Sequence, residues 1–163
     1  MTTYSLALMG VLTSLLFLGQ VILSFLPNIE LISLLLVLYT IFFGKRVFWM
    51  IYCFVLLEGF LYGFGMWFFN YLYVWALFAL VCLPFRKNRS SFFWSILCGF
   101  FGLSFGALCS LPYFLTGGAA AGFSYWLSGL GFDIIHCIGN VLLCLVLFQP
   151  LYRLLEKYIP KEV

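Results

Sequence analysis

The sequence predicts an all-α integral membrane protein, a single domain over residues 1–163 that forms a bundle of six transmembrane helices with both termini in the cytoplasm. Three observations predict this fold: the apolar composition, the length of the apolar runs and the placement of the basic residues. Hydrophobic residues make up 66% of the 163 residues and charged residues only 8%. Soluble domains average about 45–50% apolar and about 25% charged residues. A soluble fold would therefore lack the polar residues needed to cover its surface.

The apolar runs are continuous rather than alternating, which favours helices over an outer-membrane barrel. A helical span needs about 20 residues, so roughly six spans with short turns use the whole chain. The N-terminus has neither a basic region nor a clear cleavage site, so we expect no removable signal peptide. The predicted spans, separated by glycine and proline turn signals, are approximately residues 4–25, 26–43, 47–64, 68–85, 92–115 and 123–155.

The basic residues support this map. All eight fall at one end of a six-span bundle, namely Lys45, Arg46, Arg86, Lys87, Arg89, Arg153, Lys157 and Lys161. By the positive-inside rule, this end and both termini face the cytoplasm. Five or seven spans would divide the basic loops between the two sides of the membrane.

Two acidic residues are predicted to lie deep in the bilayer, where a charge is costly and usually faces a cavity or a partner. Asp133 follows the outer start of its helix by about ten residues, or roughly 15 Å. Glu58 reaches a similar depth from the opposite end of the third span. We therefore expect Asp133 and Glu58 to face each other across a shared cavity.

Polar residues form a stripe on the last span. Gly129, Asp133, His136 and Asn140 are spaced four, three and four residues apart, which places them on one helical face. A polar stripe toward lipid is unfavourable, so we expect it to point into the bundle. Two interpretations remain open at this point.

In the first interpretation, Asp133 and His136 satisfy each other or nearby backbone carbonyls and lock the bundle. In the second, Asp133 contacts a ligand in a pocket open to the outside, and His136 closes the floor by bonding Asp133 or a neighbouring carbonyl. Asn140, nearest the cytoplasm, is predicted to be a structural tie between helices.

An aromatic cluster occupies residues 62–75 in the outer third of the bundle. Trp and Tyr commonly line membrane interfaces, and this explains much of the cluster. However, aromatic walls above a few polar groups are also typical of sites for small planar ligands. The predicted residues of this rim are Trp67, Asn70, Tyr71, Trp75, Tyr125, Trp126 and, just inside the second span, Glu30.

Several classes of chemistry are not indicated. No nucleophile, base and orienting residue form a recognisable catalytic set, and no G-x-x-x-x-G-K-[ST] motif is present. The single histidine excludes a haem with two axial histidines, and the six cysteines lack metal-ligand spacing. We expect no catalytic activity, no metal, no cofactor and no nucleic-acid partner.

Two segments carry a family resemblance: Trp126–Tyr158, "WLSGLGFDIIHCIGNVLLCLVLFQPLYRLLEKY", and Phe25–Gly44, "FLPNIELISLLLVLYTIFFG". With the six predicted spans, they resemble the substrate-binding S component of energy-coupling factor (ECF) transporters. The resemblance implies a subunit of the prokaryotic cell membrane that captures a vitamin or related micronutrient from outside. It also implies docking with a transmembrane T component and two cytoplasmic ATPases, and toppling of the binder within the membrane.

The resemblance also implies a docking face on the first helix, where members of the family often carry Ala-x-x-x-Ala. This chain has Thr3-x-x-x-Ala7 and Gly10-x-x-x-Ser14 instead. Both pairs allow close helix approach in lipid, so either one can serve, or both can pack within the bundle. Two other functions remain open: a small membrane enzyme that uses Asp133 and His136, and an assembly subunit without a ligand.

Overall fold

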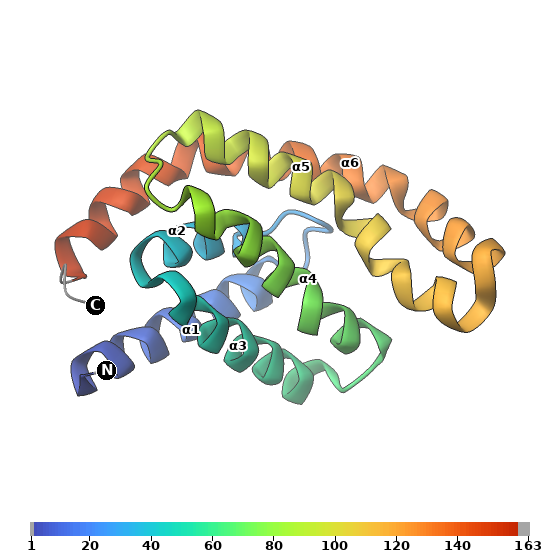
Figure 1. The fold of residues 1–163 in the computed structure, drawn as a ribbon, viewed down its shortest axis with the longest axis horizontal. Coiled ribbons are helices and arrows are strands. Elements are labelled where there is room, and N and C mark those ends of the chain that lie inside the picture. The colour runs from blue at the N-terminus through green and yellow to red at the C-terminus, as the bar shows by residue number, and fades with distance from the viewer. Residues whose placement is uncertain (1, 160–163) are drawn as a thin grey trace.

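The structure is a computed structural model that describes residues 2–159 (Figure 1). The protein is 88% helical, and the described part of the chain contains no strand. Six α-helices and two short 3-10 helices follow one another as α1 (Thr3–Leu23), α2 (Ile32–Phe43), η1 (Gly44–Arg46), α3 (Val47–Tyr62), α4 (Met66–Cys82), η2 (Leu83–Phe85), α5 (Ser91–Cys109) and α6 (Leu111–Tyr158).

Five helical stretches are long and apolar enough to cross a membrane. They are α1, the stretch Ile32–Tyr62 that joins α2 to α3, the stretch Met66–Phe85, α5 and α6. The all-helical, membrane-compatible fold that the composition predicts is therefore confirmed.

The second predicted span differs most from the structure. We expected a helix over residues 26–43, but residues 24–31 form turns and irregular chain, and α2 begins only at Ile32. At 1.5 Å per residue, its 12 residues extend about 18 Å, which is short of the roughly 30 Å of hydrocarbon in a bilayer. Pro27 and Asn28 explain the late start, because proline disfavours the helical conformation before it and Asn28 adopts a positive φ of 57°.

The helix α2 lies at the centre of the bundle. It contacts all five of the other α-helices, and most of its side chains are buried. The hydroxyl of Tyr39 donates a hydrogen bond of 2.9 Å to the carbonyl of Leu12, which ties α2 to α1. Gly44, at a φ of 56°, then redirects the chain into α3. This is a conformation that glycine adopts without a Cβ penalty.

The helices α5 and α6 run side by side (Figure 1). Glycines on α5 permit this close packing. A Cβ added at Gly102 would lie 2.9 Å from the backbone N of Cys137, and one added at Gly99 would lie 2.5 Å from Val141. Small residues have this role between helices in lipid, because close van der Waals packing replaces the hydrophobic effect there.

The last helix starts earlier than predicted. The sequence suggested a span over residues 92–115 followed by a loop, but α5 ends at Cys109, and α6 begins at Leu111. Gly118, at φ 73° and ψ −173°, interrupts α6 near its start. Residues 116–122, which we expected to form the loop between the last two spans, therefore contain a sharp bend between two helical pieces.

The two ends of the described chain meet. The hydroxyl of Tyr4 donates a hydrogen bond of 3.2 Å to the backbone carbonyl of Tyr158. The basic segments gather at this same end, since the side chain of Arg86 lies against Gly44, and Arg89 is paired with Glu156. Lys161 lies outside the described residues.

Candidate functional site

Residues 28–31 of the irregular segment 24–31 pack into the helix bundle, whereas residues 24–27 are exposed. A Cβ added at Gly139, in the middle of α6, would lie 3.6 Å from the backbone carbonyl oxygen of Asn28 and 3.7 Å from Ile29. The segment therefore packs on α6 beside the predicted polar stripe. Irregular backbone at such a depth is tolerated only where it is buried in protein or lines a cavity.

This segment brings Glu30 to the polar stripe. Nε2 of His136 lies 3.1 Å from Oε1 of Glu30, and both side chains are almost completely buried. The backbone N–H of Ser33 donates to Oε2 of Glu30 over 2.9 Å, and the Ser33 hydroxyl donates to Oε1. The Glu30 carboxylate thus accepts a hydrogen bond from a backbone N–H that has no partner within α2, and it contacts His136 at the same time.

Asn140 extends this hydrogen-bond network one helical turn further along α6. Its amide Nδ2 donates to the Ser33 hydroxyl and to the backbone carbonyl of Cys98, each over 3.2 Å. The side chain therefore lies between α2 and α5, which is a suitable position for the structural tie predicted from the sequence. Its effect on stability stays a prediction.

The stripe on α6 does point inward. Asp133, His136 and Asn140 are all buried, and the same face continues with Cys144, Phe148 and Tyr152. Gly129 is partly exposed, and a Cβ added there would meet nothing within 4 Å. The stripe therefore contributes three polar side chains to the interior rather than a continuous channel.

A cavity of about 180 Å³ lies over the Glu30–His136 pair. The segment of residues 24–31 and the end of α1 form one side of the cavity, while aromatic side chains of α4 and α5 form the other. Its lining residues are Gln20, Leu23, Ser24, Leu26, Pro27, Asn28, Ile29, Glu30, Tyr71, Trp75, Phe105 and His136.

A second cavity of about 270 Å³ adjoins the first and is lined by Gln20, Ser24, Glu58, Tyr62, Trp67 and Tyr71. Gln20, Ser24 and Tyr71 border both cavities. We refer to the two together as the paired cavities. They combine two buried carboxylates, one histidine and several aromatic rings, which are suited to binding a small organic molecule.

The aromatic rings of α4 follow one another in edge-to-face contacts along the paired cavities. The ring centroids of Trp67 and Tyr71 are 5.3 Å apart, those of Tyr71 and Trp75 are 5.5 Å apart, and both pairs are nearly perpendicular. Such contacts are favourable and fix the orientation of the rings. Three of the predicted aromatic residues therefore lie together at the paired cavities.

Other predicted site residues lie elsewhere. Asn70 is buried beneath the rim, and its Oδ1 accepts a hydrogen bond of 3.3 Å from the Tyr73 hydroxyl. Tyr125 stacks on Tyr113 with the ring centroids 4.1 Å apart. Neither these residues nor Trp126 line the paired cavities.

Asp133 differs most from its predicted place. Its Oδ1 accepts a hydrogen bond of 2.9 Å from the backbone N–H of Gly106 in α5. Among the described residues, no hydrogen bond joins it to His136 or Glu58, and it lines neither of the paired cavities. Of the two arrangements left open for this pair, direct bonding of Asp133 to His136 is not seen: Nε2 of His136 contacts Glu30, and its Nδ1 has no hydrogen-bond partner among the described residues.

Glu30 itself was expected at the outer rim of the second span, but it lies deep beside His136. Sequence reasoning also missed Phe105 and most of residues 20–29 as lining residues. One signal for them was present: the Pro27-Asn28 turn is followed by an acid and a serine at the start of an otherwise apolar helix. An acceptor side chain such as Glu30, three residues before the N–H of Ser33, has the spacing at which a side chain satisfies a free N–H at a helix start.

An apolar groove of about 400 Å³ runs between α1 and α3 on the outside of the bundle. Gly10 and Ser14 border this groove, whereas Thr3 and Ala7 do not. A Cβ added at Gly10 would meet nothing within 4 Å, so the surface there is open. Of the two small-residue pairs predicted for docking, the structure places the Gly10–Ser14 pair at a groove.

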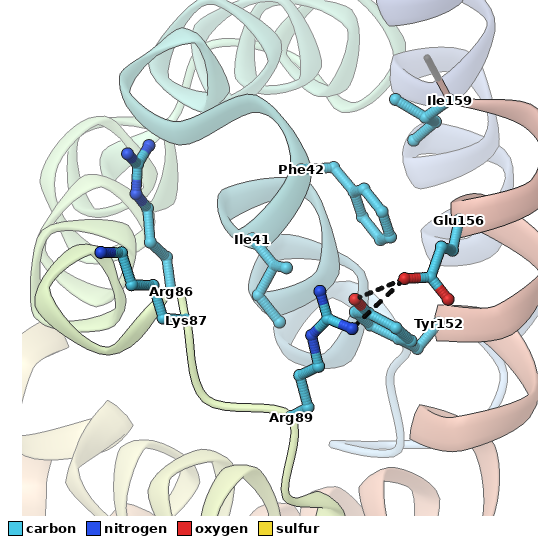
Figure 2. Close-up of a pocket in the computed structure, with 8 residues that line it drawn as sticks. All are labelled: Ile41, Phe42, Arg86, Lys87, Arg89, Tyr152, Glu156 and Ile159. Carbon is cyan, nitrogen blue, oxygen red and sulfur yellow. Dashed lines mark hydrogen bonds and ion pairs between the residues drawn. The ribbon is translucent and has the colours of Figure 1, made fainter. Parts of the chain in front are cut away.

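A basic cavity of about 620 Å³ lies at the end of the bundle opposite to the paired cavities, where the two ends of the described chain meet. Figure 2 shows Arg86 and Lys87 on one side of this cavity and Arg89 beside Tyr152 and Glu156 of α6. Glu156 accepts from Arg89 over 3.4 Å and from the Tyr152 hydroxyl over 3.2 Å. This cavity has cationic walls, whereas the paired cavities have none.

No group of three or more His, Cys, Asp or Glu side chains in residues 2–159 could hold a metal ion. All six cysteines are free, and four of them are buried.

Comparisons of the chain with family models, curated proteins and solved structures find no significant match.

Proposed function

We propose that this protein is a membrane-embedded solute-binding subunit, the S component of an ECF-type importer, that captures a vitamin-like micronutrient from outside the cell. The observation that carries the proposal is the buried Glu30–His136 pair beneath a cavity with aromatic walls. Nε2 of His136 lies 3.1 Å from Oε1 of Glu30, and Glu30 is supplied by the irregular segment before α2. Intramembrane ionisable residues are costly, and they usually mark a binding site or a pathway.

The construction of the site also favours solute capture. The Glu30–His136 pair and its neighbours Ser33 and Asn140 form one hydrogen-bond network, which holds the floor of the cavity in a single arrangement. The segment that supplies Glu30 has no regular secondary structure and also lines the cavity. A floor whose polar groups are already arranged suits a protein that binds a solute.

For orientation, we propose six spans, with the basic cavity in the cytoplasm and the paired cavities open to the outside. The clustering of the basic segments supports this assignment through the positive-inside rule. Cysteines introduced at Lys87 and Ala119, both exposed, test it with a membrane-impermeant thiol reagent on intact cells. Labelling of Ala119→Cys alone is expected, and labelling of Lys87→Cys alone would reverse the topology.

For partners, we propose that a transmembrane T component docks on the groove between α1 and α3, and that two ATPases drive uptake. The groove is apolar, with one open glycine and one exposed serine. Such a surface permits close approach of another helix in lipid, where small residues favour association.

Ligand-dependent stabilisation tests the capture function. The purified protein in detergent is melted with and without a set of water-soluble vitamins and nucleobases, and Glu30→Gln is melted beside it. A solute binder is stabilised by at least one compound, and this shift shrinks in Glu30→Gln. A membrane enzyme would instead lose turnover in His136→Ala while keeping its fold, and an assembly subunit would show neither effect.

A further inference from the structure

Glu58 is the second buried acid of the paired cavities, and its surroundings differ from those of Glu30. We infer that Glu58 and the aromatic rings around it form a subsite for an organic cation, so that the captured solute carries an ammonium group or a cationic nitrogen heterocycle. The inference rests on the proposed function and adds the class of substrate to it.

The Glu58 carboxylate has no partner in the described part of the chain. The side chain is 2% exposed, and its Oε1 is buried without a hydrogen-bond donor. Neither of the two ion pairs within residues 2–159 includes it. A buried charge is costly unless it is paired and hydrogen-bonded, so this position favours a cation supplied from outside the chain.

No basic residue in the described part of the chain is paired with Glu58. Glu58 lies in the second half of α3, toward the Gly63–Gly65 turn, whereas Lys45 and Arg46 precede the start of this helix. The other described basic residues are in residues 86–89 or near the end of α6, where they border or adjoin the basic cavity (Figure 2).

The aromatic residues beside Glu58 are of the type that binds cations. Tyr62, Trp67 and Tyr71 line the same cavity as Glu58. The faces of Trp and Tyr rings attract cations within about 6 Å of the ring centre. A carboxylate with three such rings is a combination that recognises alkylammonium groups by charge and by their apolar surface together.

The two carboxylates divide the paired cavities into unlike ends. Glu30 already has a histidine and a serine as partners, so at its end the carboxylate is paired and Nδ1 of His136 is the polar atom without a partner. The Glu58 end presents a carboxyl group without a partner beside aromatic side chains. Because Gln20, Ser24 and Tyr71 border both cavities, one molecule can place its cationic group at Glu58 and its polar end toward His136.

Tetramethylammonium chloride is the probe for this subsite, because it carries only the cationic group. Melting curves are recorded for the whole protein in detergent over a concentration series, with sodium chloride at matched ionic strength and with tert-butanol as an uncharged probe of similar shape. We expect tetramethylammonium alone to raise the melting temperature. In Glu58→Gln its half-maximal concentration should rise roughly ten- to a hundred-fold, since losing a hydrogen bond or contact to a charged group has about this effect on affinity.

A second variant supplies the missing cation from the protein itself. Gln20→Lys places an ammonium group on the wall shared with Glu58, and Gln20→Met is the uncharged control of similar length. We expect Gln20→Lys to melt at a higher temperature than Gln20→Met and to lose the response to tetramethylammonium. Asp133→Asn, which removes an acid outside the paired cavities, should keep that response.

The outcomes separate this inference from the proposed function. Equal shifts with tetramethylammonium and sodium in the wild type, or an unchanged shift in Glu58→Gln, overturn the cation subsite. If a co-purified solute is then found to be neutral or anionic, solute capture stands without it. If tetramethylammonium binds through Glu58 but the protein never carries or responds to a larger solute, the subsite stands and solute capture fails.

Discussion

Nε2 of His136 lies 3.1 Å from Oε1 of Glu30, although 106 residues separate them in the sequence. The contact joins the segment before α2 to the middle of α6, and Ser33 and Asn140 complete the network around it. A histidine and a carboxylate buried this completely depend on each other. Removing one partner leaves the other without compensation in a region of low dielectric constant.

We therefore expect Glu30→Ala and His136→Ala each to lower the free energy of unfolding by about 3–5 kcal/mol. The double variant should lose less than the sum of the two, with a coupling energy of about 0.5–3 kcal/mol. Reversible unfolding in mixed micelles measures the three variants and the wild type. Additive losses would mean that the two side chains do not interact.

The Arg89–Glu156 pair is the matched control for this cycle. Its side chains are 68% and 44% exposed and 3.4 Å apart. Exposed pairs contribute about 0–1 kcal/mol because water and salt screen them. The corresponding cycle on Arg89→Ala and Glu156→Ala should show a coupling below about 1 kcal/mol.

Asp133 gives opposite expectations from sequence and from structure. The sequence alone predicts that Asp133→Asn weakens ligand binding by about ten- to a hundred-fold. The geometry places Asp133 on the N–H of Gly106 and outside the paired cavities. We now expect Asp133→Ala to lower the melting temperature while ligand affinity changes less than about two-fold, because an unpaired buried N–H costs about 1–3 kcal/mol. Titration calorimetry and melting curves on Asp133→Asn and Asp133→Ala decide between the two.

Gly102 should be among the least replaceable residues of the bundle. A Cβ there would lie 2.9 Å from backbone atoms of Cys137 and His136, and the backbone of a packed helix cannot move aside easily. Gly102→Ala should therefore destabilise the protein by about 1–3 kcal/mol, as overpacking typically does. Gly129→Ala is the control, since nothing lies within 4 Å of its added Cβ. A melting temperature of Gly102→Ala equal to that of Gly129→Ala would contradict the close approach of α5 and α6.

The groove between α1 and α3 predicts where transport can be blocked without loss of binding. Gly10→Trp fills the groove from an open position, and Leu15→Trp adds the same bulk to an exposed residue outside it. We expect Gly10→Trp to abolish uptake in cells while the purified variant still binds solute, and Leu15→Trp to retain both. Normal uptake by Gly10→Trp would remove this surface as the docking face.

Much of the fold follows from the sequence because membrane helices obey a strong local rule. Every backbone polar group in lipid must be satisfied within its own segment, so long apolar runs predict helices well. The polar stripe on α6 was also predictable, because the spacing of Asp133, His136 and Asn140 places all three side chains on one helical face. Glycine and proline predicted a turn at Gly44 and another at Pro27-Asn28. They did not predict that the chain stays irregular up to Ile32, where α2 begins.

The partners within the site were less predictable. Nothing in the spacing of α6 indicates whether His136 faces Asp133, three residues away on the same helix, or Glu30 from another part of the chain. That choice depends on how deeply residues 24–31 enter the bundle, which is a tertiary property. Depth counted along a straight helix also failed for Glu30, because the segment that carries it is not helical.

Native mass spectrometry of the protein released from detergent, expressed in cells grown on rich medium, tests solute capture most directly. We predict a single bound small molecule in the wild type, retained by Asp133→Asn and lost from Trp75→Ala and Glu30→Gln. A wild-type protein that carries no small molecule and gains none from any medium extract, or an adduct that persists in both Trp75→Ala and Glu30→Gln, would contradict solute capture at the Glu30–His136 pair.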